Sequence, residues 1–289
     1  MYQLFCDSNS EIPWTLAEEY GLSVVQMPYI LKDVEYKYDL GKNTDFTEFY
    51  NQIRAGNMPT TCALNVQDYL DYFQPVLETG TDILMICFSS ALSSTYESLQ
   101  IAISQLLGKY PERTIKAVDT LSISMGAGIL VNVAAQMWKN GSSMDEVIAW
   151  VEENRQNVQH WFTVDDLNHL RRGGRISGAA AVMGTILEVK QILIVNSEGK
   201  IVVFEKVKGR KKALKAVAEH FFENVIAPET QLVSILHADA IEDAKLLAEL
   251  LKEKCTFKEL RIDMVGPVIG AHCGPGTLAL CFMGKPRIK

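Results

Sequence analysis

The chain has 289 residues, of which 48% are hydrophobic and 22% charged, a composition typical of about two packed globular domains and not of a disordered or collagen-like chain. Its 28 basic and 35 acidic residues give a net charge of −7, which argues against a nucleic-acid-binding protein. The N-terminus lacks a secretory signal, and the longest apolar stretch, residues 123–138, is too short and too polar to cross a membrane. We therefore expect a cytoplasmic protein with no transmembrane segment.

Residues 1–158 alternate short apolar runs with helical patterns. The expected strands cover residues 2–6, 23–31, 83–88 and 114–118. The expected helices cover residues 13–20, 46–55, 66–78, 94–107, 123–138 and 144–157. Because apolar strands separated by helices form parallel sheets with both faces covered, this half predicts an N-terminal α/β domain.

Residues 159–289 have a different pattern. The expected strands cover residues 158–164, 191–196, 200–207, 231–237 and 257–265, and the expected helices cover residues 210–224 and 241–254. Three residues separate the second strand from the third, which predicts an antiparallel hairpin. The pattern indicates a C-terminal α+β domain with a mostly antiparallel sheet. We place the boundary near residue 158 and expect a ligand in the cleft between the domains.

Six cysteines are scattered along the chain. No two of them are spaced as CxxC, and no histidine pair is spaced to complete a zinc site. Scattered cysteines in a chain without a signal are typical of reduced, buried thiols. We expect neither disulfides nor a bound metal.

Two loops are dense in side-chain hydroxyls. Residues 59–65 precede one expected helix, and residues 88–96 follow an apolar strand and open another. Ligands of parallel sheets bind outside the carboxyl ends of the strands, and helix starts accept anions. Helix capping is the alternative, but one cap needs one hydroxyl, so five in seven residues favour a polar site. The five are Ser89, Ser90, Ser93, Ser94 and Thr95.

A third loop, residues 165–177, combines two adjacent carboxylates with three arginines. Asp165 and Asp166 stand at an expected helix start, where negative charge is favourable, so we interpret them as capping residues and not as an acid–base pair. The dense basic clusters of this acidic chain are Arg171, Arg172 and Arg175 here and residues 208–212 further on. Such clusters steer negatively charged partners, and two unrelated solvated turns are the alternative.

A fourth segment, residues 266–277, is rich in glycine and proline and contains His272. We expect a rigid loop that positions this side chain, although a lone histidine is often structural. Cys273 is not expected to act as a nucleophile with it, because sequence neighbours rarely face each other. The chain has no GxSxG nucleophile elbow and no P-loop, and Gly126-Ala127-Gly128 indicates close packing at a helix start.

Taken in order, six segments resemble the DegV family of bacterial fatty-acid-binding proteins, nearly end to end. Residues 89–96, Ser-Ser-Ala-Leu-Ser-Ser-Thr-Tyr, are similar to the family's Ser-Ser-x-Leu-Ser-Gly-Thr-Tyr. The other segments are residues 6–8, 118–120 with 124–126, 166–176, 209–214 and 269–276.

The resemblance implies an N-terminal α/β domain, a C-terminal domain with an antiparallel sheet, and one long-chain fatty acid between them. By position, the residues that grip the carboxylate are Thr61, Ser93 and His272, supported by Cys62, Ser94, Thr95 and Gly270. It also implies a monomeric carrier without catalytic residues, metal or cofactor. Such a carrier presents its acid to a fatty acid kinase, which phosphorylates it to acyl-phosphate for phospholipid synthesis. We interpret Arg171, Arg172 and Arg175 as candidates for docking that kinase.

The chain departs from the family pattern near the expected head group. Cys62-Ala63-Leu64 stands where the family has Ser-Gln-Pro, Ser94 replaces a glycine, and Cys273 replaces a common threonine. The first change removes a hydroxyl and therefore bears on acyl selectivity. The alternative function is a phosphotransferase-type enzyme that uses the hydroxyl loops and His272 on a small metabolite.

Overall fold

The computed structural model describes residues 2–176 and 189–289. The N-terminal half contains a four-stranded parallel sheet in the order β2-β1-β6-β7. Its strands are β1 (Tyr2–Asp7), β2 (Ser23–Val25), β6 (Asp82–Cys87) and β7 (Ile115–Asp119). The parallel α/β arrangement predicted from the apolar runs is confirmed.

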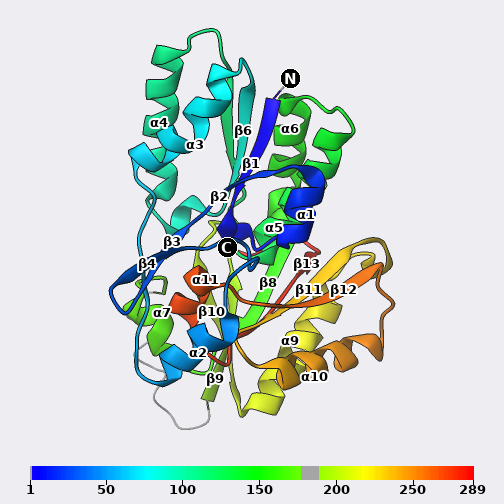
Figure 1. Ribbon diagram of the computed structural model, residues 1–289. Helices are drawn as coiled ribbons and strands as arrows, with labels where there is room; N and C mark the ends of the chain where they lie inside the picture. The colour runs from blue at the N-terminus through cyan, green and yellow to red at the C-terminus, as the bar shows by residue number, and fades with distance from the viewer. Residues whose placement is uncertain (1, 177–188) are drawn as a thin grey trace.

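Helices cover both faces of this sheet, as Figure 1 shows. On one face lie α3 (Val66–Glu78) and α4 (Thr95–Lys109), and on the other lie α1 (Trp14–Tyr20), α5 (Met125–Lys139) and α6 (Met144–Asn154). Local signals fix their ends: α3 begins at a capping box formed by Asn65 and Asp68, and the chain turns away at Gly80, whose φ is +81°.

The expected strand over residues 23–31 is wrong, because the chain breaks it between two sheets. After β2, β3 (Pro28–Leu31) joins a separate antiparallel sheet in the order β4-β3-β5 with β4 (Val34–Lys37) and β5 (Thr60–Thr61). Pro28 has no N–H to donate to a continuing ladder, and the Met27 N–H is bonded to the Ser8 hydroxyl instead, at 2.9 Å. The helix α2 (Phe46–Arg54) follows β4.

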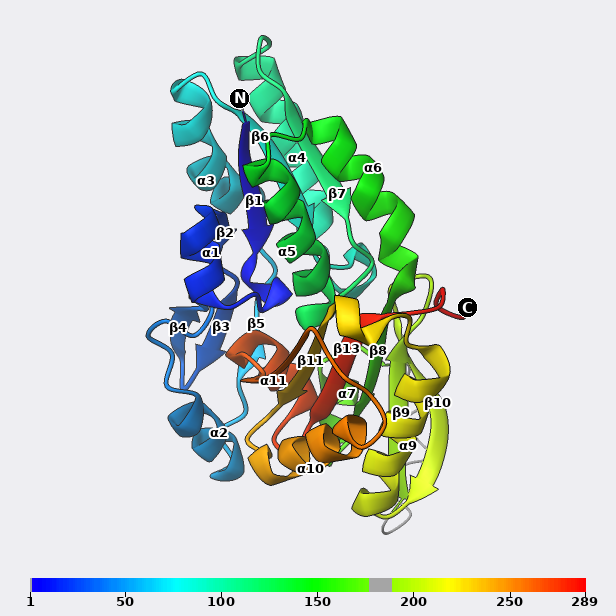
Figure 2. The same ribbon diagram turned by 90° about the vertical axis from the view of Figure 1, so that its right-hand side faces the viewer.

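The C-terminal half contains a six-stranded sheet in the order β10-β9-β8-β13-β11-β12. Its strands are β8 (Val158–Thr163), β9 (Val189–Val195), β10 (Ile201–Lys208), β11 (Leu232–His237), β12 (Glu259–Met264) and β13 (Leu278–Met283). The β9–β10 hairpin is antiparallel as predicted, and β11–β12 is the parallel pair of a mostly antiparallel sheet. The helices α9 (Arg210–Asn224) and α10 (Ile241–Lys252) cover one face (Figure 2).

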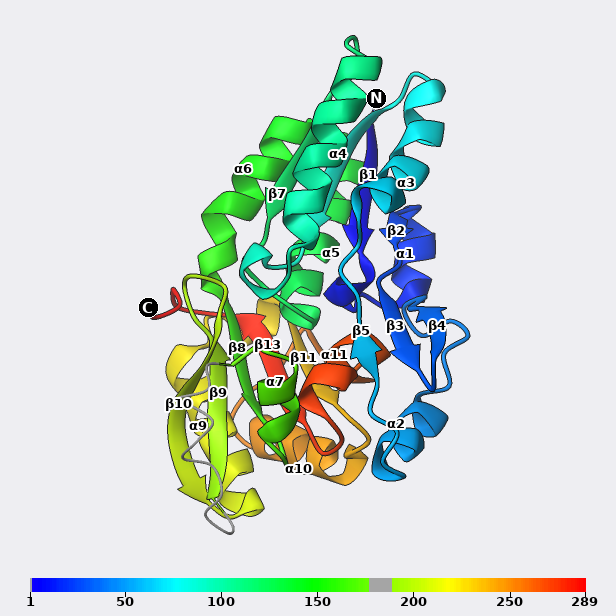
Figure 3. The ribbon, with the colours of Figure 1, turned by 90° about the vertical axis from the view of Figure 1, so that its left-hand side faces the viewer.

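The opposite face carries α7 (Asn168–Arg172) and α11 (Pro267–Cys273), which Figure 3 shows in front of the sheet. The expected rigid loop around His272 is therefore wrong, because the residue lies in α11. Pro267 occupies the first turn of this helix, and Gly274, with φ of +74°, ends it. The close-packing interpretation of Gly126 and Gly128 in α5 is confirmed, since a Cβ at either position would lie within 2.5 Å of a neighbouring atom.

All six cysteines are unpaired. Four are buried as expected, but Cys62 is exposed and Cys255 is half-buried, so the expectation is wrong for these two. No helix among the described residues is long and apolar enough to cross a membrane. The main hydrophobic core includes residues of both halves, and the domain boundary near residue 158 stays a prediction.

Candidate functional site

A cavity that opens to the surface is lined by residues of both halves. Phe162, Val195, Ile201 and Ala279 line it from one face of the six-stranded sheet. The other lining residues are Asn9, Met27, Thr61, Cys62, Ala63, Phe88, Leu92, Ser93, Ile123, Ser124, His160, Leu170, Arg175, Val265, Val268, Ile269, His272, Cys273, Thr277 and Cys281. Most of these side chains are apolar, so the cavity suits an apolar ligand with a polar end.

Thr61 and His272 form the polar contact of the cavity. The Thr61 hydroxyl Oγ1 lies 2.9 Å from Nε2 of His272, which brings together residues 211 positions apart in the chain. Tyr50 holds α11 in place, because its hydroxyl donates to the Val265 carbonyl at 2.7 Å. Gly270 permits this packing, since a Cβ there would lie 2.7 Å from the Tyr50 hydroxyl.

His272 is neutral at physiological pH. Burial, together with the positive charge of Arg175, lowers its pKa to about 4. Its Nδ1 atom is buried and has no hydrogen-bond partner among the described residues. Gly173 packs directly on that atom, since a Cβ at residue 173 would lie 2.2 Å from Nδ1. The glycine after α7 therefore sets the position of the imidazole.

Ser93 and Thr95 supply a second pair of hydroxyls. Their Oγ atoms lie 2.8 Å apart, the Thr95 N–H donates to Ser93 Oγ at 3.2 Å, and the Leu64 N–H donates to Thr95 Oγ1 at 3.3 Å. These bonds tie the start of α4 to the chain that follows β5. Ser93 lines the cavity, whereas Thr95 is buried behind it.

The remaining hydroxyls of the 88–96 loop do not line the cavity. Ser89 is buried and donates to the Gly199 carbonyl at 2.8 Å, while Ser90 and Ser94 are exposed. The hydroxyl density of this loop thus reflects turn bonds as well as the cavity. Cys62, in contrast, is exposed beside Thr61 and lines the cavity.

The arginine cluster divides between two environments. Arg171 and Arg172 are exposed on α7, and Arg172 lies 3.2 Å from Nδ1 of His169. Arg175 instead lines the cavity, where its Nε donates to the Leu92 carbonyl at 3.1 Å. Sequence reasoning placed all three on a docking surface and missed the proximity of Arg175 to the polar end of the cavity. Ser177, at the end of this segment, lies outside the described residues.

The two aspartates before α7 also have different roles. Asp166 accepts the Asn168 N–H at 2.9 Å in the turn that leads into α7, although the N-cap residue of this helix is Leu167. Asp165 does not cap: its Oδ1 accepts Lys190 Nζ at 2.8 Å and pairs with Arg210 at 3.6 Å. A Cβ at Gly276 would lie 2.1 Å from the other oxygen of Asp165.

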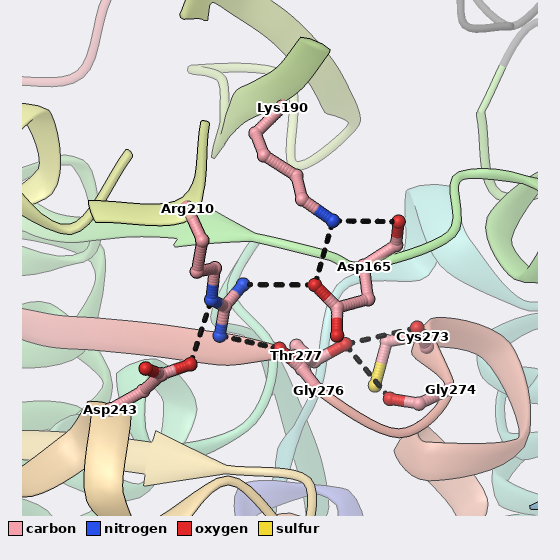
Figure 4. A network of polar contacts seen from close by, with 8 residues as sticks. All are labelled: Asp165, Lys190, Arg210, Asp243, Cys273, Gly274, Gly276 and Thr277. Carbon is pink, nitrogen blue, oxygen red and sulfur yellow. Dashed lines mark hydrogen bonds and ion pairs between the residues drawn. The ribbon is translucent and has the colours of Figure 1, made fainter. Parts of the chain in front are cut away.

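Figure 4 shows that this network extends to the segment after α11. Arg210 also pairs with Asp243 at 2.8 Å and donates to the Gly276 carbonyl at 2.7 Å. The Thr277 hydroxyl donates to the carbonyls of Cys273 and Gly274 at 2.9 and 3.0 Å. The network thus holds the residues that follow His272 in place. Arg210 has a structural role in it.

Sequence reasoning also missed three polar residues of the cavity. These are Asn9, Ser124 and His160. His160 gave no signal, since a single histidine within an expected strand is usually a core residue. Ser124 lies within a segment that carries the family resemblance, and Asn9 directly follows another such segment, residues 6–8, which was the available indication.

Comparisons with known proteins agree with this architecture. The chain is 42% identical over 286 residues to a DegV domain-containing protein of Clostridium perfringens, covering 99% of this chain and 98% of that protein. It matches the crystal structure of a fatty acid binding DegV family protein of Streptococcus agalactiae with a TM-score of 0.86 and 28% identity, covering 99% of both chains. A fatty-acid-binding DegV family protein of Thermus thermophilus matches with a TM-score of 0.85 and 28% identity, covering 98% of this chain and 99% of that one. A family model described as "Uncharacterised protein, DegV family" matches residues 1–285, and the chain therefore belongs to the DegV family.

Proposed function

We propose that this protein binds one long-chain fatty acid, with the tail in the cavity and the carboxylate at the Thr61–His272 contact. The observation that carries the proposal is a mostly apolar cavity in which the Thr61–His272 contact lies close to the positive charge of Arg175. The structural relatives from Streptococcus agalactiae and Thermus thermophilus, which are fatty-acid-binding proteins, support it.

The two ends of the ligand contribute to binding in different ways. Burying about fifteen carbons contributes roughly 0.8 kcal/mol each, or about 12 kcal/mol as an upper bound, so the tail supplies affinity. A buried carboxylate needs donors to compensate its lost hydration. Hydroxyls of Thr61 and Ser93, an N–H of neutral His272 and the guanidinium of Arg175 are available for this purpose.

The carboxylate site is tested by Ser93→Ala, with Ser94→Ala as the matched control. Ser93 lines the cavity and Ser94 is exposed. We expect loss of one donor to weaken fatty acid binding by about 1–3 kcal/mol in the first variant, with binding unchanged in the second. Equal affinities of both variants for hexadecanoic acid, measured by rebinding to delipidated protein, would contradict this site.

We further propose that the protein is a non-catalytic monomeric carrier that presents the acid to a fatty acid kinase. The exposed Arg171 and Arg172 lie on α7, beside Gly173, which packs on His272, so a partner bound there would reach the carboxylate end. Positive charges of this kind steer association with a negatively charged protein. The mostly apolar cavity favours a lipid over the small metabolite that a phosphotransferase would take.

The docking proposal is tested by charge reversal. Arg172→Glu should slow acyl-phosphate formation in a mixture with a fatty acid kinase, while fatty acid binding stays at the wild-type level. Lys215→Glu, on the exposed side of α9, is the control. Unchanged phosphorylation with Arg172→Glu would exclude this surface, and acyl-phosphate formation without any kinase would support the enzyme alternative.

A further inference from the structure

The cavity wall contains a buried imidazole apart from the Thr61–His272 contact. His160, in β8, is 3% exposed and lines the cavity. Its ring packs on the first turn of α5, where a Cβ at Gly126 would lie 1.9 Å from Nε2. The Ile123 N–H points to the same Nε2 atom at 3.5 Å. The ring is therefore fixed on one side by the start of α5.

These contacts identify the ring nitrogen of His160 that carries the hydrogen. Since Nε2 faces a backbone N–H, it is the acceptor, and the ring hydrogen resides on Nδ1. Burial and the positive charge of Arg287 lower the pKa of His160 well below its usual value, so the ring is neutral. Nδ1 is buried and, within the described parts of the chain, has no hydrogen-bond partner. His160, a residue of the cavity lining, thus carries a buried donor with no acceptor among the described residues.

Asn9 adds an acceptor to the same cavity. The residue is 4% exposed, lies in the turn after β1 and lines the cavity. Its backbone N–H is bonded to the Asp7 carboxylate at 3.0 Å, but its side-chain Oδ1 is buried without a partner among the described residues. Unpaired buried polar groups are costly and rare, so an unpaired donor and an unpaired acceptor on two residues of one apolar cavity lining point to a polar ligand group.

The strand β13 shows where along the cavity His160 lies. Thr277, Ala279 and Cys281 all line the cavity, and the Thr277 hydroxyl is bonded to the carbonyl of Cys273, the neighbour of His272. Cys281 is the register partner of His160. At about 3.4 Å per residue, Cys281 lies roughly 13 Å along the strand from Thr277. A long-chain acid held by its carboxylate at His272 therefore passes His160 with the middle or distal part of its tail.

We propose that His160 and Asn9 select a fatty acid that carries a hydroxyl group on the middle or distal part of its chain. The hydroxyl oxygen accepts the hydrogen of His160 Nδ1, and the hydroxyl hydrogen is donated to Asn9 Oδ1. This inference rests on the proposed function, because the carboxylate end sets which carbons reach the two side chains.

The direct test compares acids that differ in one hydroxyl. The delipidated full chain is titrated with octadecanoic acid and with its 2-, 10- and 12-hydroxy derivatives, by displacement of a fluorescent fatty acid. We expect the 10- or the 12-hydroxy acid to bind about tenfold more tightly than octadecanoic acid, the gain of one or two hydrogen bonds. The 2-hydroxy acid, whose hydroxyl lies beside the carboxylate, should gain nothing.

Variants assign the preference to the two side chains. His160→Leu and Asn9→Leu should each reduce the preference while octadecanoic acid binds as well as before or better. His220→Leu is the matched control, since His220 stacks on Trp161 with 4.1 Å between ring centroids, away from the cavity lining. A preference that survives both cavity variants would overturn the proposal.

The outcomes separate this inference from the proposed function. Binding of octadecanoic acid without a preference for either mid-chain hydroxy acid overturns the inference alone. Water, and not a ligand hydroxyl, would then be the partner of the two polar groups. Failure of every acid to bind overturns the proposed function as well. Circular dichroism shows whether each variant folds. If one does not, the comparison of plain and hydroxylated acids on the wild-type protein still tests the inference.

Discussion

At the scale of single residues, the polar end of the cavity depends on side chains from four elements. Thr61 comes from β5, Ser93 from the loop before α4, Arg175 from the segment after α7 and His272 from α11. The neutral state of His272 follows from its burial beside Arg175, and Gly173 gives the ring its space. Each of these contributions can be tested by a separate substitution.

Replacing Thr61 with valine removes the hydroxyl and keeps the shape of the side chain. We expect Thr61→Val to weaken fatty acid binding by about 1–3 kcal/mol, since a donor to the carboxylate is lost and His272 loses its 2.9 Å contact. Thr60→Val is the control, because Thr60 is exposed on the other side of β5. Titration calorimetry with hexadecanoic acid measures both. Equal affinities for the two variants would remove Thr61 from the site.

A methyl group at residue 173 displaces His272. Because a Cβ on Gly173 would lie 2.2 Å from Nδ1, Gly173→Ala should reduce fatty acid affinity at least tenfold, whereas Gly108→Ala, with no atom within 4 Å, should not. Fluorescence displacement measures affinity, and urea unfolding checks that both variants remain folded. Wild-type affinity in Gly173→Ala would show that the imidazole position is unimportant.

At the scale of elements, one buried carboxylate joins three segments around the cavity. Glu11, 6% exposed, accepts the Ser124 hydroxyl at the start of α5 and, at 2.5 Å, the Gly266 N–H at the start of α11. Burial raises its pKa to about 7. Between its unfolded pKa near 4.5 and pH 7, the folded state therefore holds more protons than the unfolded state.

The excess of bound protons in the folded state fixes the direction in which stability changes with pH. The contribution of Glu11 to the free energy of unfolding should fall as the pH rises from about 4.5 to about 7 and then stay constant. In Glu11→Gln this contribution is absent, so the difference in stability between wild type and variant should change across that window. Urea unfolding between pH 4.5 and pH 8 measures it, with the exposed Glu19→Gln as the control. A difference independent of pH would contradict the raised pKa.

Most elements could be predicted from the sequence, and the exceptions have physical causes. The helix ends at residues 66–78 and 210–224 were predicted correctly, because caps and glycines are local signals. The strand Leu278–Met283 was not predicted: it lies at the centre of its sheet, is apolar on both faces and so lacks alternation. The glycine-rich segment 266–277 looked like a loop, although Pro267 and Gly274 mark the two ends of a short helix.

The candidate site was predictable where a motif carried it. Thr61, Ser93 and His272 were named from the family resemblance, and all three line one cavity. Arg175 and His160 were not assigned to it, because their roles depend on tertiary neighbours such as Leu92 and Ile123. Whether these residues hold a carboxylate or a hydroxyl stays a prediction.

At the scale of the whole molecule, the cavity is built from elements of both halves. A fatty acid that contacts β5 and the loop before α4 on one side and α11 and the six-stranded sheet on the other stabilises only the arrangement in which these elements are together. Binding is therefore coupled to overall stability.

Delipidation should lower the thermal stability of the protein. A free ligand concentration of one hundred times Kd adds about 2.7 kcal/mol to the free energy of unfolding, so returning hexadecanoic acid should raise Tm in a concentration-dependent way. Differential scanning fluorimetry measures the shift, with hexadecanol as a control that lacks the carboxylate. Equal shifts with acid and alcohol would show that the polar end contributes nothing.

The most direct measurement is native mass spectrometry of freshly purified protein, followed by organic extraction and identification of the lipid. The account predicts one long-chain fatty acid, plain or hydroxylated, per chain. Protein that carries a phosphorylated metabolite, or that is empty and takes up no fatty acid when it is added, would contradict it.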